Sequence, residues 1–304
     1  MGVFSALKNI LRDSNTREYI WYYYLSRFVS DKLYLQVQYK IKTGKKLNLK
    51  NPKFFSEKIQ WLKLYDRNPE YSKLADKYEV RKHISEVIGK DYLIPLLGVW
   101  DRFEDIDFSS LPEKFVLKCT HDSKSVIFCA DKVSFDIAKA KEKINTRLGK
   151  SLYNSNKEWC YRNIIPRIIC EEYKTDESGV ELKDYKVFCF NGTPMYIQVD
   201  FSRFASHKRN MYDLDWQPFL MESHYPTDWA VKIGKPTRLQ EMLDIASKLS
   251  VGISFLRVDF YIADERLYIG ELTFYPQSGY MIFSPPEYNE VFGDLVKLPT
   301  KRKA

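Results

Sequence analysis

Two apolar segments near the C-terminal end of the chain carry charged residues in their interiors. Arg257 and Asp259 lie inside LRVDFYIA, and Glu271 lies inside IGELTFY. Both segments have the composition of buried β-strands, in which side chains two positions apart share one face. Carboxylates gathered on such a face supply the hard oxygen ligands that Mg²⁺ prefers in proteins.

The connection between these two segments decides whether the carboxylates meet. A three-residue loop over 264–266 would place Asp259 opposite Glu271 and Arg257 opposite Thr273. Opposed carboxylates on paired strands repel each other unless they share a positive partner, and Mg²⁺ is the cation that the pattern predicts. A two-residue loop would instead turn Glu271 to the other face, which would leave two independent surface acids.

Two further segments are expected to form β-hairpins with a lysine in the first strand. EKFVLKCTHDSKSVIFCA contains two apolar runs around a polar loop and places Lys118 in the first run. DYKVFCFNGTPMYIQVD carries the turn signal Asn191-Gly192 and places Lys186 at the corresponding position. Each lysine is either solvated or a point charge for phosphate oxygen atoms, and N–H groups of the polar loop could add donors. Together the two lysines could hold a polyphosphate from both sides.

A single strand, PRIICEEYKT, lies between the two hairpins and ends in Glu171 and Glu172. Acidic residues at the end of a strand commonly begin a surface turn. The alternative is a connector whose backbone groups pair with the edge of an adenine base.

The elements that must position these strands include a helical first part of the chain. Its last helix is expected from about Pro69 to Ile88, with Gly89 as its stop signal. Proline, serine and aspartate then mark a passage into a new unit near Leu111. A further helix is expected at about 134–149.

The formal net charge of +8 resides entirely in the first 60 residues, which hold twelve lysines and arginines against four acidic residues. Within them, REYIWYYYLSRFVSDKLYLQVQYKIKTGKK interleaves basic and aromatic residues, a mixture suited to an anionic lipid surface or an acidic polysaccharide. The alternative is a helical region whose aromatic face packs on the main body while its lysines are solvated. No nucleic-acid-binding motif accompanies the charge, so nucleic acid is not an expected partner.

Composition indicates a globular protein of a reducing compartment. The 304 residues are 44% hydrophobic, enough for a large core and roughly two domains. Five cysteines form no CxxC pair and leave one over, which favours reduced thiols. No segment reads as a signal peptide or a membrane span. The expected location is the cytoplasm, with attachment to the inner face of the cell membrane as a further expectation from the basic segment.

The order of the motifs resembles a known family. FVLKCTHDSKS, ICEEY, DYKVFCFNG, RVDFY and GELTFYPQSG follow the order of the ATP-grasp superfamily. Together with NPKFFSEKIQWLKLYDR, KLADKYEVR and DYLIPLLGVWD they resemble the teichuronopeptide-biosynthesis (TupA-like) ATP-grasp family of bacterial surface-polysaccharide loci, over roughly residues 50–295. The resemblance implies an α+β ATP-grasp fold, with a nucleotide between two antiparallel-sheet subdomains. The implied divisions are a basic helical region at 1–60, a pre-ATP-grasp region at 61–112, a lid subdomain at 113–172 and a C-terminal core with the metal site at 173–304.

The resemblance also implies a role for each candidate residue. The implied ATP contacts are Lys118, His121, Ser123, Lys124, Ser125, Glu171, Glu172, Asp184 and Lys186. The implied metal ligands are Asp259, Glu271 and Thr273, the last where such enzymes usually carry an asparagine. The implied substrate contacts are Arg203, Arg209, Ser278 and Gly279. The implied catalytic residues are Lys118, Lys186 and Arg257, of which the arginine would stabilise an anionic tetrahedral intermediate.

The implied activity is that of an ATP- and Mg²⁺-dependent carboxylate–amine ligase, which forms an amide bond through an acyl phosphate and releases ADP and phosphate. The expected substrates are a uronic-acid or amino-acid carboxylate and an amine, and the expected product is a capsular or surface polysaccharide. The loop HDSKS lacks the glycines that usually let backbone amides approach phosphate, although Lys124 could supply charge there. Other functions stay open: a glycan-modifying kinase, a glycosyltransferase, or a non-catalytic nucleotide-binding protein of capsule assembly.

Overall fold

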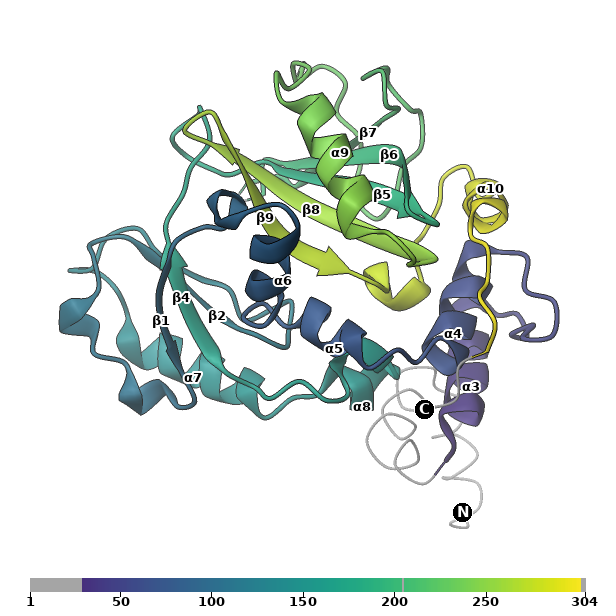
Figure 1. Cartoon of the computed structure of the whole chain (residues 1–304), viewed down its shortest axis with the longest axis horizontal. Helices are drawn as coiled ribbons and strands as arrows, with labels where there is room; N and C mark the ends of the chain where they lie inside the picture. Colours follow the sequence, from purple (N-terminus) through teal and green to yellow (C-terminus); the bar gives the residue numbers. More distant parts are fainter. Residues whose placement is uncertain (1–28, 204, 302–304) are drawn as a thin grey trace, which may run out of the picture.

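Two antiparallel β-sheets form the centre of the molecule (Figure 1). The computed structural model describes residues 29–203 and 205–301. The four-stranded sheet, in the order β1-β4-β2-β3, consists of β1 (Leu96–Trp100), β2 (Phe115–Cys119), β3 (Ile127–Cys129) and β4 (Ile168–Glu172). The five-stranded sheet, in the order β7-β6-β5-β8-β9, consists of β5 (Asp184–Phe190), β6 (Thr193–Phe201), β7 (Lys208–Tyr212), β8 (Phe255–Ala263) and β9 (Arg266–Thr273). The α+β class and both expected hairpins are confirmed.

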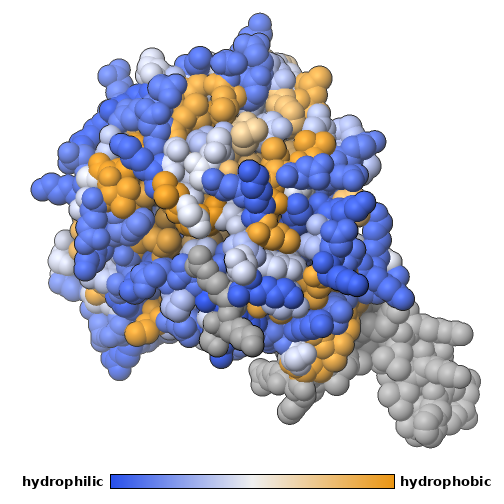
Figure 2. All heavy atoms as spheres, turned by 45° about the vertical axis from the view of Figure 1, so that its right-hand side comes forward, coloured by the Kyte–Doolittle hydropathy of each residue, from blue (hydrophilic) through white to orange (hydrophobic). Residues whose placement is uncertain are grey.

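Helices surround the two sheets. The α-helices are α3 (Asp31–Thr43), α4 (Phe55–Tyr65), α5 (Glu70–Ala75), α6 (Val80–Val87), α7 (Ile137–Leu148), α8 (Leu152–Asn156), α9 (Leu239–Leu249) and α10 (Tyr288–Leu295). The short 3₁₀ turns are η2 (Lys90–Tyr92), η3 (Phe103–Asp105), η4 (Phe108–Ser110), η5 (Trp159–Tyr161) and η6 (Pro276–Gly279). On the face seen in Figure 2, hydrophilic side chains predominate and apolar side chains form small separate groups. None of the helices within 29–203 and 205–301 is long and apolar enough to cross a membrane.

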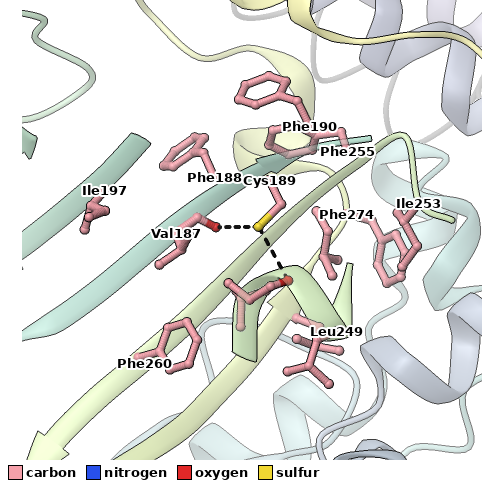
Figure 3. Close-up of a cluster of buried hydrophobic side chains, with 14 of the residues drawn as sticks. Val187, Phe188, Cys189, Phe190, Ile197, Leu249, Ile253, Phe255, Phe260 and Phe274 are labelled. Carbon is pink, nitrogen blue, oxygen red and sulfur yellow. Dashed lines mark hydrogen bonds between the residues drawn. The ribbon is translucent and has the colours of Figure 1, made fainter. Parts of the chain in front are cut away.

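Each strand of the five-stranded sheet sends alternate side chains to two different environments. Val187 and Cys189 point towards α9, where the Cys189 thiol donates to the Ala246 carbonyl at 3.7 Å (Figure 3). Phe188 and Phe190 point to the opposite face (Figure 3). Helix α9 therefore packs against β5, β6 and β8 on one face of the sheet, and the charged residues Asp184 and Lys186 of β5 lie on the other face.

The second face is apolar at one end and charged at the other. At the apolar end, the ring of Phe55 from α4 packs 4.9 Å from that of Phe255, and the ring of Phe292 from α10 packs 5.5 Å from that of Phe190. Such edge-to-face contacts hold both helices on the sheet. The charged end lies further along the same strands, where Asp184 and Lys186 precede the two phenylalanines of β5.

The four-stranded sheet repeats this division. Phe115, Leu117 and Cys119 lie on one face and pack in a core with residues of α7, as their alternation predicts. Lys118 projects from the other face, beside Glu171 of β4. The polar faces of the two sheets contribute to one cavity, described below.

The helix expected from Pro69 to Ile88 is wrong, because the structure has two helices, α5 and α6, with a break after Ala75. In the break, the Asp76 carboxylate accepts hydrogen bonds from the N–H groups of Tyr78 and Glu79 at 2.7 and 3.2 Å. An aspartate that bonds the backbone ahead of it competes with helix continuation. The stop at Gly89 is confirmed, since this residue has a φ of 106°.

The aromatic residues of α3 are buried while its lysines are exposed. Tyr34 and Tyr39 are 0% and 2% exposed and pack with Leu47 and Leu64 in a small core. Within 31–43 the structure therefore agrees with the second expectation for the basic segment, a helix whose aromatic face packs on the main body, and not with a surface of exposed aromatic residues. The part of the basic, aromatic segment before residue 29 lies outside the described residues. The divisions at residues 60, 112 and 172 stay predictions, and β1, which precedes residue 112, pairs with β4 of the four-stranded sheet.

Candidate active site

Strands β8 and β9 place Asp259 opposite Glu271 and Arg257 opposite Thr273, as expected from the sequence. The acidic side chains therefore share one face of the sheet. In the structure, an oxygen of each of the three expected metal ligands lies near one atom, Nη2 of Arg257.

The loop that produces this pairing is not the expected one. Ala263 pairs with Arg266, so the turn holds only Asp264 and Glu265, both with positive φ. A turn of this length would send Glu271 to the other face, but the register shifts by one residue between the pairs of Asp259 and Phe260. The extra residue of β9 is Gly270, and the resulting bulge restores the alignment. The three-residue loop was wrong, and the pairing was right because the bulge compensates for the shorter turn.

Arg257 occupies the point at which the metal ligands converge. Its Nη2 lies 2.6 Å from Asp259 Oδ2, 3.5 Å from Glu271 Oε1 and 3.2 Å from Thr273 Oγ1. A cationic nitrogen thus stands where three hard oxygen donors meet, which is the donor set that suits Mg²⁺. In the described part of the chain, no group of three or more His, Cys, Asp or Glu side chains could hold a metal ion. The two carboxylates fit Mg²⁺ only as part of a shell completed by water and phosphate oxygens.

Lys186 is buried among carboxylates on the same face. Its Nζ lies 2.8 Å from Asp259 Oδ2 and 3.9 Å from Asp200 Oδ2, and it donates to Asp184. Burial alone would lower the pKa of Lys186, but Asp184 and Asp259 outweigh it and raise the pKa. Burial raises the pKa of Asp259, and the cations of Arg257 and Lys186 act in the opposite direction. Lys186 is therefore a charged lysine whose ammonium group is held in place by Asp184 and Asp259.

Lys118 of the four-stranded sheet is also paired with a carboxylate. Its ammonium contacts the Glu171 carboxylate, which also accepts from Arg81 Nη1 at 3.1 Å. Arg81, on α6, donates as well to the Ile94 carbonyl at 2.8 Å. Glu171 is therefore an internal partner of two cations, whereas Glu172 pairs at 3.1 Å with the half-buried Lys174.

A cavity of about 190 Å³ lies between the two sheets. Lys118, Glu171 and Glu172 reach it from the four-stranded sheet, Tyr261 reaches it from β8 of the other sheet, and Arg203 reaches it from the segment that follows β6. The remaining lining is mostly apolar, namely Ile94, Val116, Val126, Phe128, Tyr173 and Leu182, with Lys174 and Glu181 as further polar members. An apolar pocket with a few charged groups at its edge suits a base with an attached phosphate chain.

The loop of residues 121–125 is held by its own side chains. The Asp122 carboxylate accepts from the N–H groups of Lys124 and Ser125 at 3.0 and 2.9 Å and pairs with Arg147 of α7. Ser125 Oγ accepts from the N–H of Cys119 at 2.8 Å. Two of the amides expected to face phosphate are thus occupied.

The remaining loop residues divide between the interior and the surface. His121 is buried, with Nε2 at 3.2 and 3.1 Å from the carbonyls of Arg147 and Lys150. Burial lowers the pKa of His121. Ser123 and Lys124 are exposed. Of the four loop residues expected to contact ATP, these two therefore have the most accessible side chains.

Lys77 is a site residue that the sequence reasoning missed. Its ammonium donates to the Asp122 carbonyl at 2.6 Å and lies 3.5 Å from Glu271 Oε2, while its N–H donates to the Thr120 carbonyl at 3.1 Å. The helix break at Asp76 is what brings this side chain to the site. The motif KLADKYEVR contained the signal, since it belongs to the family resemblance, but an uninterrupted helix hid its role.

The two candidate substrate arginines lie in different surroundings. Arg203 is partly exposed, lines the cavity and lies 3.4 Å from Asp184 Oδ2. Oδ1 of Asp184 is buried and has no hydrogen-bond partner among the described residues. Arg209 is buried and fully engaged, with Asp200 at 2.6 and 3.0 Å and the Ser223 carbonyl at 2.8 Å.

Ser278 and Gly279 lie against α4. The buried Lys63 donates to the carbonyl and hydroxyl oxygens of Ser278 at 2.8 and 2.7 Å. Burial lowers the pKa of Lys63 to about 8, although Glu158 opposes the shift. Gly279 has a φ of 76°, and a Cβ there would lie 2.6 Å from Gln60 Nε2. In η6 these residues are held by the helix rather than open to a pocket.

The fold and the site define an α+β protein with a cavity between two antiparallel sheets, lined by lysine, arginine and carboxylate side chains. Residues 57–297 match the family described as TupA-like ATPgrasp, and the chain therefore belongs to the TupA-like ATP-grasp family. The expected family and fold are confirmed.

Solved structures with a similar fold include several ligases. The D-alanine–D-alanine ligase of Bacillus anthracis is 16% identical, with 66% of this chain and 56% of that chain covered and a TM-score of 0.36. D-cycloserine synthetase DcsG is 16% identical, with coverage of 73% and 69% and a TM-score of 0.39. The RimK domain protein ATP-grasp of Sphaerobacter thermophilus DSM 20745 is 11% identical, with coverage of 76% and 70% and a TM-score of 0.41. These TM-scores add no argument to the family match. The chain spans little more than half of the Bacillus anthracis ligase, and no curated protein matches it.

Proposed function

We propose that this protein is an ATP- and Mg²⁺-dependent carboxylate–amine ligase. One observation carries the proposal: a continuous series of ionic contacts begins at Arg203, which lines the cavity, and continues along the charged face of the five-stranded sheet. It passes from Arg203 to Asp184, Lys186, Asp259, Arg257, Glu271 and Lys77, and ends at the carbonyl of Asp122 in the loop beside Lys118. A site in which three cations, Lys77, Lys186 and Arg257, face the carboxylates of the two proposed metal ligands suits a metal-bound triphosphate.

When the nucleotide binds, the cations of the site would each exchange a carboxylate partner for a phosphate oxygen or move aside for the metal. Lys118 would leave Glu171 for a phosphate oxygen, and Lys186 would leave Asp259 for another. Arg257 would move from the point where the metal ligands converge. Asp184, with one unpartnered oxygen, would accept a hydrogen bond from a ribose hydroxyl. The base would occupy the apolar part of the cavity beside Val116 and Tyr261.

Asp259 and Glu271 would hold Mg²⁺, with Thr273 as a third oxygen, and the ion would neutralise phosphate charge. In the first step, a substrate carboxylate oxygen attacks the γ-phosphorus of ATP and the bond to the β,γ-bridging oxygen breaks. The products of this step are an acyl phosphate and ADP. Lys118 and Lys186 would stabilise the charge on the transferring group. Both lysines project from strands, β2 and β5, so only their side chains would move to reach the phosphate.

In the second step an amine attacks the acyl carbon, and phosphate leaves with formation of an amide. The developing oxyanion needs a charged donor close by, and Arg257, after moving aside for the metal, would still project from β8 beside Asp259. Loss of one such donor typically costs about 3 to 4 kcal/mol of transition-state stabilisation. Arg209 is too tightly bound to Asp200 to serve as the main clamp for a substrate carboxylate, which leaves Arg203 as the better candidate.

The proposed substrates are a uronic-acid or amino-acid carboxylate and an amine, and the proposed product is a modified bacterial surface polysaccharide. This part of the proposal rests on the family alone. The ligases among the solved structures are named for D-alanine–D-alanine and D-cycloserine, and neither name refers to a glycan.

Hydroxylamine trapping tests the activity without knowledge of the amine. The protein is incubated with MgATP, hydroxylamine and a panel of uronic and amino acids, and both hydroxamate and free phosphate are measured. A ligase yields equal amounts of both, and Asp259→Asn abolishes them while Asp264→Asn does not. A kinase would leave the phosphate on the product without hydroxamate. A non-catalytic binding protein would be stabilised by MgATP without turnover. The N–H groups of Lys124 and Ser125 favour this alternative, because they already donate to Asp122.

A further inference from the structure

A second polar cavity lies away from the candidate active site, between the start of α4 and the segment that follows α10. It is a groove of about 590 Å³. One wall is the loop before α4 with Lys50, the other wall is the segment 294–301 with Lys297 and Lys301, and Trp61 and Lys58 of α4 lie between them. The right-hand side of Figure 1, which carries α3, α4 and α10, comes forward in Figure 2.

The groove is strongly positive. Four lysines line it, Lys50, Lys58, Lys297 and Lys301, against a single acid, Asp294. Among the described residues, none of the four ammonium groups forms an ion pair with a carboxylate, unlike the lysines of the candidate active site. Unpaired like charges that face each other across a groove raise the local concentration of anions.

Both walls of the groove are fixed in place. The Asn48 side chain accepts from the N–H groups of Lys50 and Asn51 at 3.2 and 3.0 Å, which sets the first wall. The side chain of Asn191, at the β5–β6 turn, binds the Leu295 carbonyl at 2.7 Å and the N–H of Lys297 at 2.9 Å, which sets the second. Lys58 Nζ joins the two walls through the Val296 carbonyl at 2.8 Å. The groove therefore exists before any ligand binds.

We infer that this groove binds a chain of an acidic polysaccharide that carries carboxylates. A membrane surface is a poorer match, because interfacial segments insert apolar side chains, and no large apolar side chain is exposed in 44–61 or 294–301. Single-stranded nucleic acid is also a poorer match, because it needs exposed aromatic rings for stacking, and Trp61 is only 6% exposed. Asp294 and Asn51, which nucleic acid would not require, supply acceptors for sugar hydroxyl groups.

The choice of a glycan rests on the proposed function, and the site is distinct from the one that would bind ATP. Chain binding here would keep the enzyme on its polymer between reactions, because a second contact raises the effective concentration of reactive groups. The groove would thus recognise a polymer, while the cavity between the sheets recognises the nucleotide.

Calorimetry with oligogalacturonate, without nucleotide, tests the inference. Wild-type protein should bind the oligomer, not neutral dextran, and roughly tenfold more weakly when salt rises from about 50 to about 300 mM, since exposed charges are screened. Lys50→Glu/Lys297→Glu should lose roughly tenfold or more in affinity. The matched control Lys139→Glu/Lys235→Glu makes the same charge change on exposed residues elsewhere and should bind like the wild type. Equal losses in both variants, or no binding by the wild type, would overturn the inference.

Two further probes separate the alternatives. Vesicles of phosphatidylglycerol and phosphatidylcholine, or an oligothymidylate, would overturn the inference if either bound more tightly than oligogalacturonate and lost affinity in Lys50→Glu/Lys297→Glu. MgATP should raise the unfolding temperature of this variant as much as that of the wild type. If MgATP stabilised neither protein while the oligomer still bound in the groove, the proposed ligase function would fail and the groove would stand.

Discussion

The Cα atom of Gly270 lies against the phenol ring of Tyr261 on the neighbouring strand, so that a Cβ at residue 270 would stand 2.7 Å from Cε2 of that ring. Tyr261 lines the cavity between the sheets, and Gly270 is the bulge residue that aligns Asp259 with Glu271. One contact therefore links the shape of the nucleotide cavity to the pairing of the metal ligands.

Gly270→Ala should destabilise the protein by about 1 to 3 kcal/mol, because the added methyl group forces the Tyr261 ring or the bulge to move. Stabilisation by MgATP should weaken as well. Thermal unfolding with and without nucleotide measures both effects. Gly149→Ala is the control, since a Cβ at residue 149 meets nothing within 4 Å. Equal behaviour of the two variants would contradict a role for the Gly270–Tyr261 contact.

ATP and Mg²⁺ should stabilise the protein together and only weakly apart. ATP alone would bring negative phosphates next to Asp259 and Glu271, while Lys186 and Arg257 remain bound to Asp259. Thermal shifts with ATP plus EDTA, with Mg²⁺, and with MgATP measure the difference. Asp259→Asn should remove the combined effect, and Asp264→Asn, whose side chain is 71% exposed, should retain it. Equal stabilisation by ATP with EDTA and by MgATP would argue against the metal site.

Lys77 should control the acid sensitivity of Glu271. Burial raises the pKa of Glu271, but Lys77, Arg257 and Lys186 outweigh it and lower the pKa from the ordinary value of 4.5 to about 2. Because the folded-state pKa is depressed, this carboxylate stabilises the fold above pH 4.5, and the contribution is lost as the pH falls towards 2.

In Lys77→Met the pKa of Glu271 should be higher, so that this loss of stability should begin at a higher pH. Unfolding free energy measured against pH for the wild type and the variant tests the expectation. Lys73→Met is the matched control, because Lys73 is exposed on α5 and its ion-pair partner within the described residues is Glu70. Curves of the same shape for all three proteins would show that the contact between Lys77 and Glu271 does not affect the titration.

Arg209 should act as a structural residue. Arg209→Leu leaves the buried Asp200 without its main partner, and breaking a buried pair typically costs about 3 to 5 kcal/mol. Arg209→Leu with Asp200→Asn should cost less than the sum of the single changes. Urea unfolding of the four proteins measures the coupling. Normal stability of Arg209→Leu with weakened substrate binding would instead restore Arg209 as a substrate clamp.

Local patterns predicted much of the framework because strand alternation and turn signals depend on neighbouring residues. The faces of β2, the Asn191-Gly192 hairpin and the opposition of Asp259 to Glu271 followed from such patterns. That opposition was reached through a loop one residue too long, since the sequence gives little warning that Gly270 forms a bulge.

Contacts between distant segments could not be read in the same way. Lys77 and Glu271 are in contact although they lie far apart in the sequence. The turn at Asp76 that interrupts the helix after Ala75 was also missed, because the residues around it are compatible with a continuous helix. His121 and Ser125 looked accessible because they belong to a polar loop. Asp122 and the carbonyls at the end of α7 turn that loop inward.

The hydrogen bond from the Lys77 amide to the Thr120 carbonyl offers a natural sensor of the loop that follows Thr120. If that loop lifts from the site, this amide loses its acceptor and should exchange its proton with solvent more rapidly. Deuterium uptake at a single backbone position, in an otherwise unaltered chain, would therefore record how often the site opens and whether MgATP keeps it shut.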